Sequence, residues 1–342
     1  MINFTEDKKI NSSPCATIVV PCYNEEEVLP ETVKELGAIR QNLVGQGAIS
    51  PASKLLFVND GSRDKTWQLI QQFTREYDYV AGIKFTRNYG HQNALLAGMS
   101  VAVKHSDLII TIDADLQDDV NAIPKMVAAY QAGNDVVYGV RNSRATDTVF
   151  KRRTALAYYG LMKRLGVNLV PDSADYRLLS KRATEALLQY RERNLFLRGM
   201  VPLVGFKSTK VYYPRKERFA GESKYPLGKM LHFALDGITS FSIAPIHLIM
   251  GLGVTTVIIS IVLMIYTVVE KIRGNVVSGW SSLMVSIWLL GGIQLISLSV
   301  IGEYVGKVFT EVKHRPRFNI EEETYSRQFE EGDRDTQREH LD

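Results

Sequence analysis

Residues 107–117 read DLIITIDADLQ, an apolar run that ends in two closely spaced aspartates. The part from 107 to 112 has the length and the β-branched content of a buried strand. In open α/β sheets ligands bind beyond the carboxyl ends of the strands, which is where Asp113 and Asp115 would lie. Two like charges this close are costly unless a cation lies between them, and Mg²⁺ and Mn²⁺ prefer oxygen ligands. The stretch therefore predicts a divalent metal that bridges the aspartates to a diphosphate.

The same strand pattern occurs earlier, at residues 16–20 (ATIVV) and 54–58 (KLLFV), and a further strand is expected at 135–140. Helical patterns separate the strands. We expect these helices at about residues 26–40, 65–76, 91–104 and 121–132. Strands that alternate with helices predict an α/β fold with a parallel sheet, in a domain over residues 14–215.

A chain of 342 residues is long enough for one large α/β domain and a second module. Its net charge of +4 is too small to indicate a nucleic-acid partner, and we expect none.

Cys15 and Cys22 show neither CxxC spacing nor a His or Cys cluster, so we interpret them as reduced thiols in the cytosol. Residues 1–13 form a polar extension without the apolar segment of a signal peptide, which favours a cytoplasmic start of the chain.

Two long apolar stretches lie in the last third of the chain. Residues 246–269 and 281–302 contain no Asp, Glu, Lys or Arg, and helices of 24 and 22 residues are long enough to cross a hydrocarbon core of about 30 Å. We predict a two-helix transmembrane hairpin within residues 241–310. A pair of buried core helices would instead need a larger surrounding domain than the 40 residues that follow.

The basic residues around the hairpin predict its orientation. Lys and Arg prefer the cytoplasmic side, and they are more frequent at the outer ends of the hairpin than in its connection. The outer residues are Lys224, Lys229, Lys307, Lys313, Arg315 and Arg317, and the connection has Lys271 and Arg273. We therefore predict a multi-pass protein of the plasma membrane with the α/β domain and both termini in the cytoplasm.

Two further segments have the pattern of amphipathic interfacial helices. Residues 150–165 place apolar residues on one helical stripe and Lys or Arg elsewhere, which suits an anionic membrane surface, although the stripe could equally pack on the sheet. Residues 216–240 form a juxtamembrane segment that is apolar on one side from 225 to 238. The polar tail at 311–342 is rich in charged residues after Asn319, and we expect it to be solvated or disordered in the cytoplasm.

The loop after the first strand, residues 21–26 (PCYNEE), is a candidate nucleotide-binding loop. It lacks GxGxxG, which argues against a dinucleotide-binding fold. Tyr23 offers a ring on which a base could stack, and the Asn and Glu residues beside it offer acceptors for the polar edge of the base. An ordinary strand-to-helix turn with Asn24 as helix N-cap would explain the same residues.

The loop after the second strand, residues 59–66 (NDGSRDKT), is the second candidate. Gly61 permits a tight turn, and Ser62 or Asp64 can cap the helix that follows. No such structural role is left for Asp60. We therefore predict that the Asp60 carboxylate accepts a hydrogen bond from a base or a ribose.

Together with later motifs these loops resemble a known family. The stretches are VPCYNEE at 20–26, NDGS at 59–62, RNYG at 87–90, DAD at 113–115, DSADYRLLS at 172–180, RNLF at 193–196 and GESK at 221–224. In this order they resemble the family 2 glycosyltransferases of the GT-A (Rossmann-like) fold. The later motifs and the two spans are similar to the polyprenyl-phosphate subgroup, which includes bactoprenol (undecaprenyl-phosphate) glucosyltransferases and, more distantly, dolichol-phosphate mannose synthases. The resemblance covers residues 15–318.

The resemblance implies a donor site with a metal. The residues at the uridine or guanosine end of the donor would be Pro21, Tyr23, Glu25 and Asp60. The residues around the Mg²⁺ or Mn²⁺ would be Asp113, Asp115 and Gln117. Ser223 and Lys224 would close over the donor, unless their loop is simply a solvated basic segment at the lipid headgroups.

On the acceptor side, the resemblance implies that Arg141 faces phosphate and that Asp175 meets the acceptor. Arg177 lies two residues further, where its guanidinium could pair a phosphate bidentately, and a structural ion pair between Asp175 and Arg177 is the alternative. A lipid monophosphate has its second pKa near ~6, so it needs no strong general base. Asp175 is therefore better interpreted as a group that positions the acceptor.

The function that the resemblance implies is inverting transfer of glucose or N-acetylglucosamine from a UDP-sugar to undecaprenyl or another polyprenyl phosphate. The reaction would take place at the cytoplasmic membrane face and serve cell-envelope glycosylation, and the family suggests a homo-oligomer, with a tetramer as the suspected form. A processive polysaccharide synthase would need more spans and a Gln-x-x-Arg-Trp motif, which the sequence lacks. A non-catalytic membrane scaffold would not need its four candidate site aspartates, which are Asp60, Asp113, Asp115 and Asp175.

Overall fold

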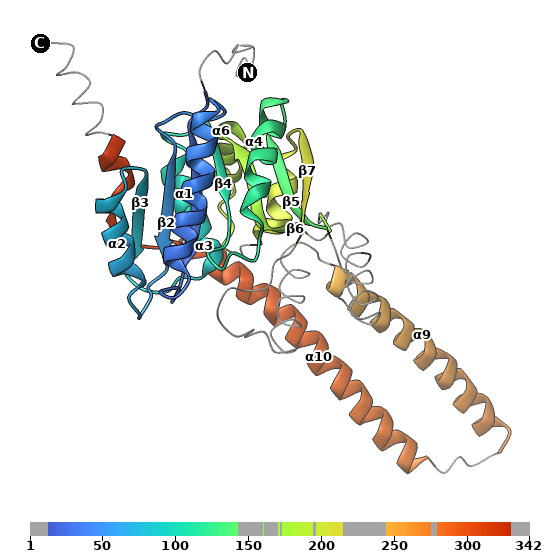
Figure 1. Cartoon of the computed structure of the whole chain (residues 1–342). Coiled ribbons are helices and arrows are strands. Elements are labelled where there is room, and N and C mark those ends of the chain that lie inside the picture. The colour runs from blue at the N-terminus through green and yellow to red at the C-terminus, as the bar shows by residue number, and fades with distance from the viewer. Residues whose placement is uncertain are drawn as a thin grey trace, which may run out of the picture. The chain divides into compact units, whose positions relative to one another are not determined.

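The computed structural model describes residues 13–142, 160, 170–171, 173–193, 196–214, 244–274 and 279–329 (Figure 1). The chain divides into two compact units. The α/β unit contains residues 1–159, 168–224 and 315–342, and the helical unit contains residues 160–167 and 225–314. All strands of the described residues belong to the α/β unit.

The α/β unit is built on a sheet with the spatial order β7-β5-β6-β4-β1-β2-β3-β8 in the described residues. The strands are β1 Ala16–Cys22, β2 Lys54–Asn59, β3 Val80–Phe85, β4 Leu108–Thr111, β5 Val136–Arg141, β6 Ser173–Ser180, β7 Ser208–Tyr213 and β8 Ile320–Glu323. The strands β1 to β4 pair in parallel, as do β5 and β7, whereas β6 and β8 run antiparallel to their neighbours. The predicted strands are confirmed, but the sheet is mixed and not wholly parallel.

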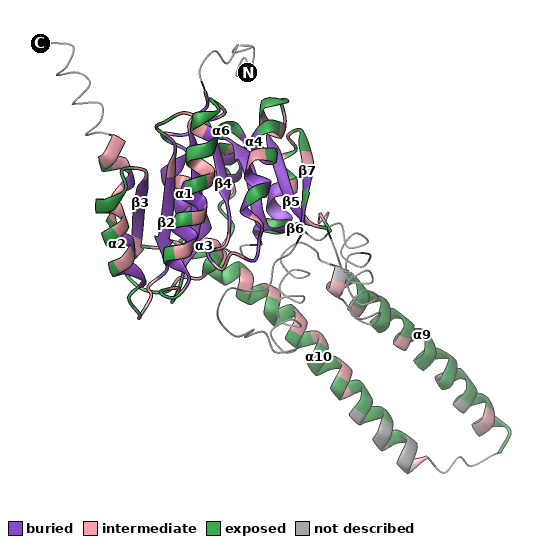
Figure 2. Ribbon diagram, in the orientation of Figure 1, coloured by how far each residue is buried: buried purple, intermediate pink, exposed green. Residues whose placement is uncertain are grey.

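Helices cover both faces of the sheet, so the strands are buried between them (Figure 2). One face packs on α1, α2 and α4, and the other on α3 and α6. The helices are α1 Leu29–Gly45, α2 Thr66–Glu76, α3 His91–Ala102, α4 Ile123–Gln131, α6 Lys181–Gln189 and the short α7 Leu197–Met200. The helices expected from the sequence pattern are confirmed, with shifts of a few residues at their ends.

Helix α3 approaches the sheet closely because Gly98 has no side chain. A Cβ atom at Gly98 would overlap Val19 of β1 and would lie 3.1 Å from Val58 Cγ2 of β2. Helix α3 follows β3, so its first residue, His91, lies at the carboxyl edge of the parallel strands. Close packing of the helix therefore fixes the position of His91 at this edge.

Strand β6 brings a distant part of the sequence to the carboxyl end of β4. The two strands pair antiparallel, and Thr111 at the end of β4 lies opposite Arg177 in the middle of β6. The Thr111 hydroxyl donates a hydrogen bond to the carbonyl oxygen of Asp175 at 2.6 Å. Asp175 and Arg177 therefore stand beside the turn that carries Asp113.

The chain returns to the sheet after its second long helix. Strand β8 pairs antiparallel with β3, which would otherwise be an open edge. Tyr325 is fully buried, and its hydroxyl lies 2.7 Å from Thr17 Oγ1 and 3.0 Å from Ser106 Oγ. The expectation of a solvated tail after Asn319 is therefore wrong for residues 320–329, because this segment supplies the backbone partners of β3 and fills a core position. Residues 330–342 lie outside the described residues.

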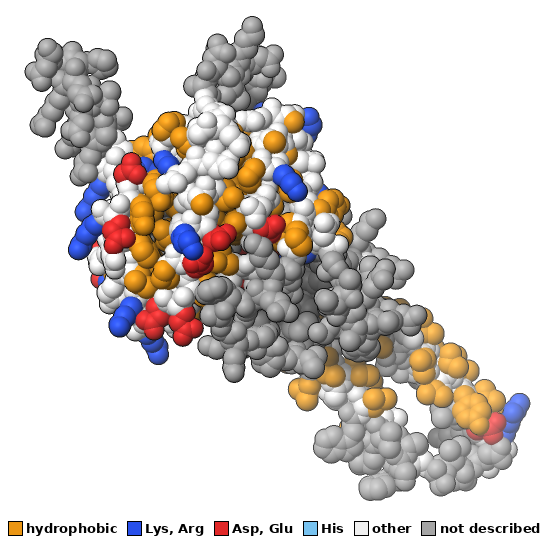
Figure 3. Space-filling view, in the orientation of Figure 1, with side chains coloured by type: hydrophobic (Ala, Val, Ile, Leu, Met, Phe, Trp, Pro, Cys, Tyr) orange, Lys and Arg blue, Asp and Glu red, His pale blue; other side chains and the backbone are white. Residues whose placement is uncertain are grey.

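The helical unit contains α9 (Ala244–Ile272) and α10 (Trp280–Val312). Pro245–Glu270 and Leu289–Val312 are long and apolar enough to cross a membrane, judged by length and composition. Hydrophobic side chains are prominent on both helices (Figure 3). The helices fit the predicted hairpin, although the second span lies further along α10 than the predicted stretch at 281–302.

Several predicted features lie outside the described residues. They are most of the polar extension at 1–13, the interfacial helix at 150–165 apart from Gly160, and the juxtamembrane segment at 216–240 with its loop residues Ser223 and Lys224. The limits of the domain at 14–215 and the closing role of that loop therefore stay predictions.

Candidate active site

The turn after β4 carries the two aspartates that the sequence predicts as metal ligands. Leu116 adopts a left-handed backbone conformation with φ 53°, which is uncommon for a residue with a branched side chain. The turn lets the backbone N–H of Gln117 donate to Asp115 Oδ1 at 3.2 Å. Gln117 itself is buried. Strain at this position is typical of functional sites, where the surrounding structure maintains it.

Asp113 is the more unusual of the two aspartates. Its Oδ1 atom is buried and accepts no hydrogen bond from the described residues, although His91 Nε2 lies 3.4 Å away. Burial and the nearby carboxylates raise the pKa of Asp113 to about 6, while His91 opposes this increase. A buried carboxylate oxygen without a hydrogen-bond donor is a good ligand for a hard cation.

The described ranges contain no cluster of three or more His, Cys, Asp or Glu side chains that could hold a metal ion by themselves. A divalent ion at Asp113 and Asp115 would therefore need further oxygen ligands from a bound molecule. Mg²⁺ is often held in this way, by one or two carboxylates together with the phosphates of a substrate. The donor set thus fits a metal that binds together with a diphosphate.

Asp175 lies at the centre of a group of cationic side chains. Arg177 Nη2 donates a short hydrogen bond to Asp175 Oδ1, and Arg198 Nη2 lies 3.2 Å from Asp175 Oδ2. His91 Nε2 lies 3.6 Å from the same Oδ2 atom and 3.4 Å from Asp113 Oδ1. His91 therefore stands between the candidate metal ligand and the candidate acceptor residue.

These neighbours decide the charge of Asp175. Burial alone would raise the pKa of Asp175, but Arg198, His91 and Arg177 outweigh burial and hold the pKa well below its usual range. Burial lowers the pKa of His91, but Asp175 and Asp113 raise it more strongly. At neutral pH Asp175 is thus an ionised carboxylate among positive charges, and it is a poor proton acceptor.

Arg177 and Arg198 differ in their access to solvent. Only 4% of the Arg177 side chain is exposed, and its two Nη atoms contact Asp175 and the carbonyl oxygen of Leu197. Arg198 is 49% exposed while it contacts the same carboxylate. The structure therefore favours the ion-pair alternative for Arg177 and presents Arg198 as the accessible cation.

His91 and Arg198 were missed in the sequence because they follow quoted motifs instead of lying within them. His91 comes directly after the RNYG stretch at 87–90, and Arg198 comes two residues after the RNLF stretch at 193–196. Neither motif shows by itself that its neighbour meets Asp175. The antiparallel pairing of β6 with β4 brings the three residues together.

Arg141, at the end of β5, is held by a buried carboxylate. Its Nε and Nη2 atoms lie 3.1 and 2.9 Å from Asp118 Oδ1, and the Tyr213 hydroxyl donates to the same oxygen at 2.6 Å. Asp118 Oδ2 is buried and has no hydrogen-bond partner among the described residues. Arg141 remains 28% exposed, so part of its guanidinium can meet an anion.

The loop after β1 places one aromatic ring in solvent. Tyr23 is 42% exposed, whereas Pro21 is buried within β1 and Glu25 is intermediate. Asn24 does not cap α1, which begins at Leu29. Instead, its side chain accepts a hydrogen bond from the backbone N–H of Arg63 at 2.9 Å, which joins the loops after β1 and β2.

Asp60 has the structural role that the sequence did not reveal. Its two carboxylate oxygens accept hydrogen bonds from the backbone N–H groups of Tyr89 and Gly90 at 2.6 and 2.9 Å. Burial raises the pKa of Asp60, and these two donors oppose the increase. The inference that Asp60 lacks a structural role is therefore wrong, and its contact with a base or ribose stays a prediction. The N-cap of α2 is Lys65, which makes no side-chain cap hydrogen bond, but the Asp64 side chain just before it accepts a hydrogen bond from the N–H of Thr66 at 3.0 Å.

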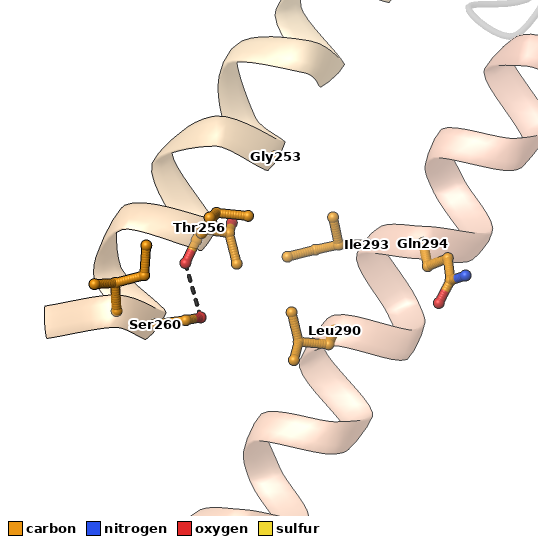
Figure 4. Close-up of a pocket in the computed structure, with 8 residues that line it drawn as sticks. Gly253, Thr256, Ser260, Leu290, Ile293 and Gln294 are labelled. Carbon is orange, nitrogen blue, oxygen red and sulfur yellow. Dashed lines mark hydrogen bonds between the residues drawn. The ribbon is translucent and has the colours of Figure 1, made fainter. Parts of the chain in front are cut away.

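A pocket of about 520 Å³ lies between α9 and α10 in the helical unit (Figure 4). The residues that Figure 4 labels are Gly253, Thr256 and Ser260 on α9 and Leu290, Ile293 and Gln294 on α10. None of its lining residues is charged. The pocket therefore lacks the cationic or metal partners that a nucleotide diphosphate would need.

Comparisons with known proteins show the family of the chain. Residues 17–188 match the model of glycosyl transferase family 2. An uncharacterized glycosyltransferase of Bacillus subtilis, YkoT, is 51% identical over 93% of this chain and 94% of its own length. The bactoprenol glucosyl transferase of Shigella phage SfV is 38% identical over 90% of this chain and 98% of its own.

Among solved structures, glucosyl-3-phosphoglycerate synthase from Mycobacterium tuberculosis, in complex with Mn²⁺, UDP-glucose and phosphoglyceric acid, is 17% identical to this chain. The match covers 66% of this chain and 78% of the length of the synthase, with a TM-score of 0.43.

The mixed α/β sheet fits the GT-A glycosyltransferase fold that the sequence motifs led us to expect. The chain belongs to glycosyl transferase family 2, which confirms the resemblance seen in the sequence motifs.

Proposed function

We propose that the protein transfers glucose or N-acetylglucosamine from a UDP-sugar to undecaprenyl phosphate or another polyprenyl phosphate at the cytoplasmic face of the plasma membrane. The product would be a lipid-linked sugar for cell-envelope glycosylation. The observation that carries the proposal is the ionised Asp175 beside Asp113, in contact with Arg177, Arg198 and His91, because this arrangement suits two phosphorylated substrates. The similarity to a bactoprenol glucosyl transferase over nearly the whole chain supports a lipid phosphate as the acceptor.

The donor would bind across the loops after β1, β2 and β4. The exposed ring of Tyr23 can stack on a base, and Pro21, Glu25 and Asp60 lie in or beside the same two loops. Asp60 has two hydrogen bonds to the backbone, and a carboxylate has room for further ones, so it can still accept from a nucleoside.

A Mg²⁺ or Mn²⁺ ion fits at Asp113 and Asp115 because the buried Oδ1 of Asp113 accepts no hydrogen bond from the described residues. Gln117 follows in the same turn. When bound, such an ion would stabilise the negative charge that develops on the departing nucleoside diphosphate.

The acceptor phosphate would approach Arg198, His91 and the exposed part of Arg141. Its second pKa near ~6 leaves it largely ionised at neutral pH, so its oxygen can attack the anomeric carbon without a strong base. The new bond forms as the bond from the anomeric carbon to the diphosphate oxygen breaks, which inverts the configuration. Asp175 would hold the arginine and the histidine in place, in agreement with its low pKa.

The helical unit would anchor the protein in the membrane. The spans at Pro245–Glu270 and Leu289–Val312 are long enough to cross it, and the basic residues at their outer ends favour a cytoplasmic location of the α/β unit and of both termini. Because the isoprenoid acceptor cannot leave the bilayer, an anchor raises the effective concentration of enzyme and acceptor.

The decisive experiment is a transfer assay with the purified full-length protein in liposomes that contain undecaprenyl phosphate. A panel of radiolabelled UDP-sugars and GDP-mannose is supplied, and the organic phase is counted. We expect label in a lipid that releases the sugar under mild acid, with an inverted anomeric configuration by NMR. Label that appears only in a long polymer would favour a processive polysaccharide synthase, and no transfer from any donor would favour a non-catalytic scaffold.

Orientation and assembly need their own measurements. A cysteine that replaces Gly274 in the connection between α9 and α10 should react with an impermeant thiol reagent from the periplasmic side of intact cells. Labelling only after the cells are opened would contradict the proposed orientation.

Light scattering of the detergent-solubilised protein would test the homo-oligomer, and a mass of one chain would exclude the suspected tetramer.

A further inference from the structure

The segment of residues 315–329, which we call the C-terminal strap, crosses the α/β unit from one end of β3 to the other. Ile320 pairs with Phe85 at the carboxyl end of β3, and Gln328 donates to the carbonyl oxygen of Val80 at the amino end, at 3.0 Å. The parallel strands carry the candidate site at their carboxyl ends. The beginning of the strap therefore lies on the side of the site, and its end lies on the opposite side.

The beginning of the strap contacts two separate segments. Phe318 stacks on Phe85 with ring centroids 5.3 Å apart, and the carbonyl oxygen of Asn319 accepts a hydrogen bond from the N–H of Thr86 at 3.2 Å. On the other side, Arg317 Nη2 donates to the carbonyl oxygens of Tyr190 and Glu192 at 2.6 and 3.0 Å.

Both contacted segments lead directly to side chains of the site. The residues after Thr86 include Tyr89 and Gly90, whose N–H groups hold Asp60, and His91, which contacts Asp113 and Asp175. The residues after Glu192 lead to α7 and to Arg198, the accessible cation on Asp175.

A direct hydrogen bond joins the two segments. Gln92 Oε1 in the first turn of α3 accepts from the N–H of Leu197 at the start of α7, at 2.9 Å. Gln92 therefore holds the start of α7, next to Arg198, and Arg317 anchors Tyr190 and Glu192 a few residues earlier in the sequence. The mechanism described above does not use this anchorage.

We propose that Arg317 is a positioning residue for the acceptor side of the site, because it fixes the segment that delivers Arg198 to Asp175. One guanidinium nitrogen bridges two carbonyl oxygens, which a neutral side chain cannot do with comparable strength. In the sequence, residues 313–316 separate Arg317 from the end of α10. The assignment of the phosphate to Arg198 rests on the proposed function, whereas the positioning of the segment by Arg317 does not.

The test compares three variants of the full-length protein in liposomes. Arg317→Ala removes the bridge, and Arg317→Lys keeps a positive donor. The matched control is Gln328→Ala, which removes the strap's hydrogen bonds to Val80 and Lys54, the first residues of β3 and β2, at the strand ends away from the site. Each variant is measured for amide hydrogen exchange, for UDP binding with Mn²⁺ by calorimetry, and for transfer to undecaprenyl phosphate from whichever donor the panel identifies.

Arg317→Ala should raise the KM for undecaprenyl phosphate by about tenfold, the size expected for the loss of one or two hydrogen bonds from a charged donor. The Kd for UDP should change by less than about twofold, because the nucleoside loops keep their contacts. Amides in residues 190–200 should exchange faster, those in β1 should not, and Arg317→Lys should recover part of both effects. Gln328→Ala should leave the KM unchanged.

Two results would overturn the proposal. Unchanged exchange in residues 190–200 of Arg317→Ala would show that the bridge does not position this segment. An equal rise in KM for Gln328→Ala would show that the strap acts only through overall stability. If no donor supports transfer, the proposed function fails, but the exchange measurement still decides whether Arg317 positions the segment.

Discussion

Replacement of Asp175 by asparagine tests how the structure uses this carboxylate. Asp175 and Arg177 form a buried pair in which 12% and 4% of the side chains are exposed. Breaking such a pair by removing one charge costs about 3–5 kcal/mol, and an asparagine that still accepts one hydrogen bond should lie near the lower value. The contact with Arg198 adds little, because that side chain is half exposed and water screens its charge.

We therefore expect Asp175→Asn to lower the free energy of unfolding by about 3 kcal/mol, which corresponds to a decrease of roughly 6–12 °C in Tm for a domain of this size. Thermal unfolding of the detergent-solubilised protein measures this decrease. The double variant Asp175→Asn with Arg177→Met removes the unpaired charge, so it should recover most of the stability but no transfer activity. Asp135→Asn is the control, because Asp135 pairs with Arg182 away from the site.

The pH dependence separates positioning from proton transfer. The pKa of Asp175 is lowered in the folded protein, so its contribution to stability is present above the unfolded pKa of about 3.9 and is lost as the pH falls through the folded pKa. Between about pH 6 and 9 the charge of Asp175 itself does not change, so any pH dependence of the loss in Asp175→Asn should follow His91, whose pKa Asp175 helps to raise: the loss of stability should be larger below that raised pKa than above it. A Tm equal to that of the wild type, or turnover that rises toward the wild-type value at high pH, would refute this reasoning.

Three further predictions concern the donor side. Asp115→Asn should weaken the Mn²⁺-dependent binding of UDP by at least about tenfold, with excess EDTA giving the same loss, and calorimetric binding that is unchanged would exclude Asp115 as a ligand. Because the pKa of Asp113 is raised to about 6, Mn²⁺-dependent UDP binding should weaken about fivefold between pH 6 and pH 5 as the carboxyl group takes up a proton, and an equal affinity at both values would contradict the assignment. Gly61→Ala should cost at least about 2 kcal/mol of stability and impair UDP binding, since Gly61 has φ +65° and a Cβ there would collide with the backbone of Arg87 and Asn88. Normal thermal unfolding of that variant would show that the loop after β3 can move aside.

Apolar runs and helical periodicity in the sequence predicted the strands and helices whose own residues carry a clear pattern. The run at residues 107–112 and the helical periodicity at 91–104 both correspond to observed elements, β4 and α3. Strand β3 was missed because Gly82 and Lys84 interrupt its apolar pattern. Strand β8 was missed because IEEE is a charged sequence, and its position at the sheet edge depends on pairing with β3 and not on burial of its own side chains.

The candidate site was predicted in part for a similar reason. Asp113 and Asp115 are neighbours in the sequence, so the motif itself reveals their proximity. The contacts of His91 and Arg198 with Asp175 depend on the antiparallel pairing of β6 and on the position of α7, which no local pattern specifies. The hydrogen bonds from Tyr89 and Gly90 to Asp60 were invisible for the same reason, and the carboxylate therefore seemed free for a ligand.

Strand β8 gives the two apolar helices the topology of an insertion, since the sheet is completed by chain that follows them. A protein shortened after residue 214 would lose β8 together with the helices, which would leave β3 as a bare edge and deprive Thr17 and Ser106 of the Tyr325 hydroxyl. A soluble fragment is therefore better obtained by excision, with a flexible linker in place of residues 215–314, than by truncation. Affinity tags at the carboxyl terminus should likewise begin beyond residue 329, where they do not compete with the last strand for its place in the sheet.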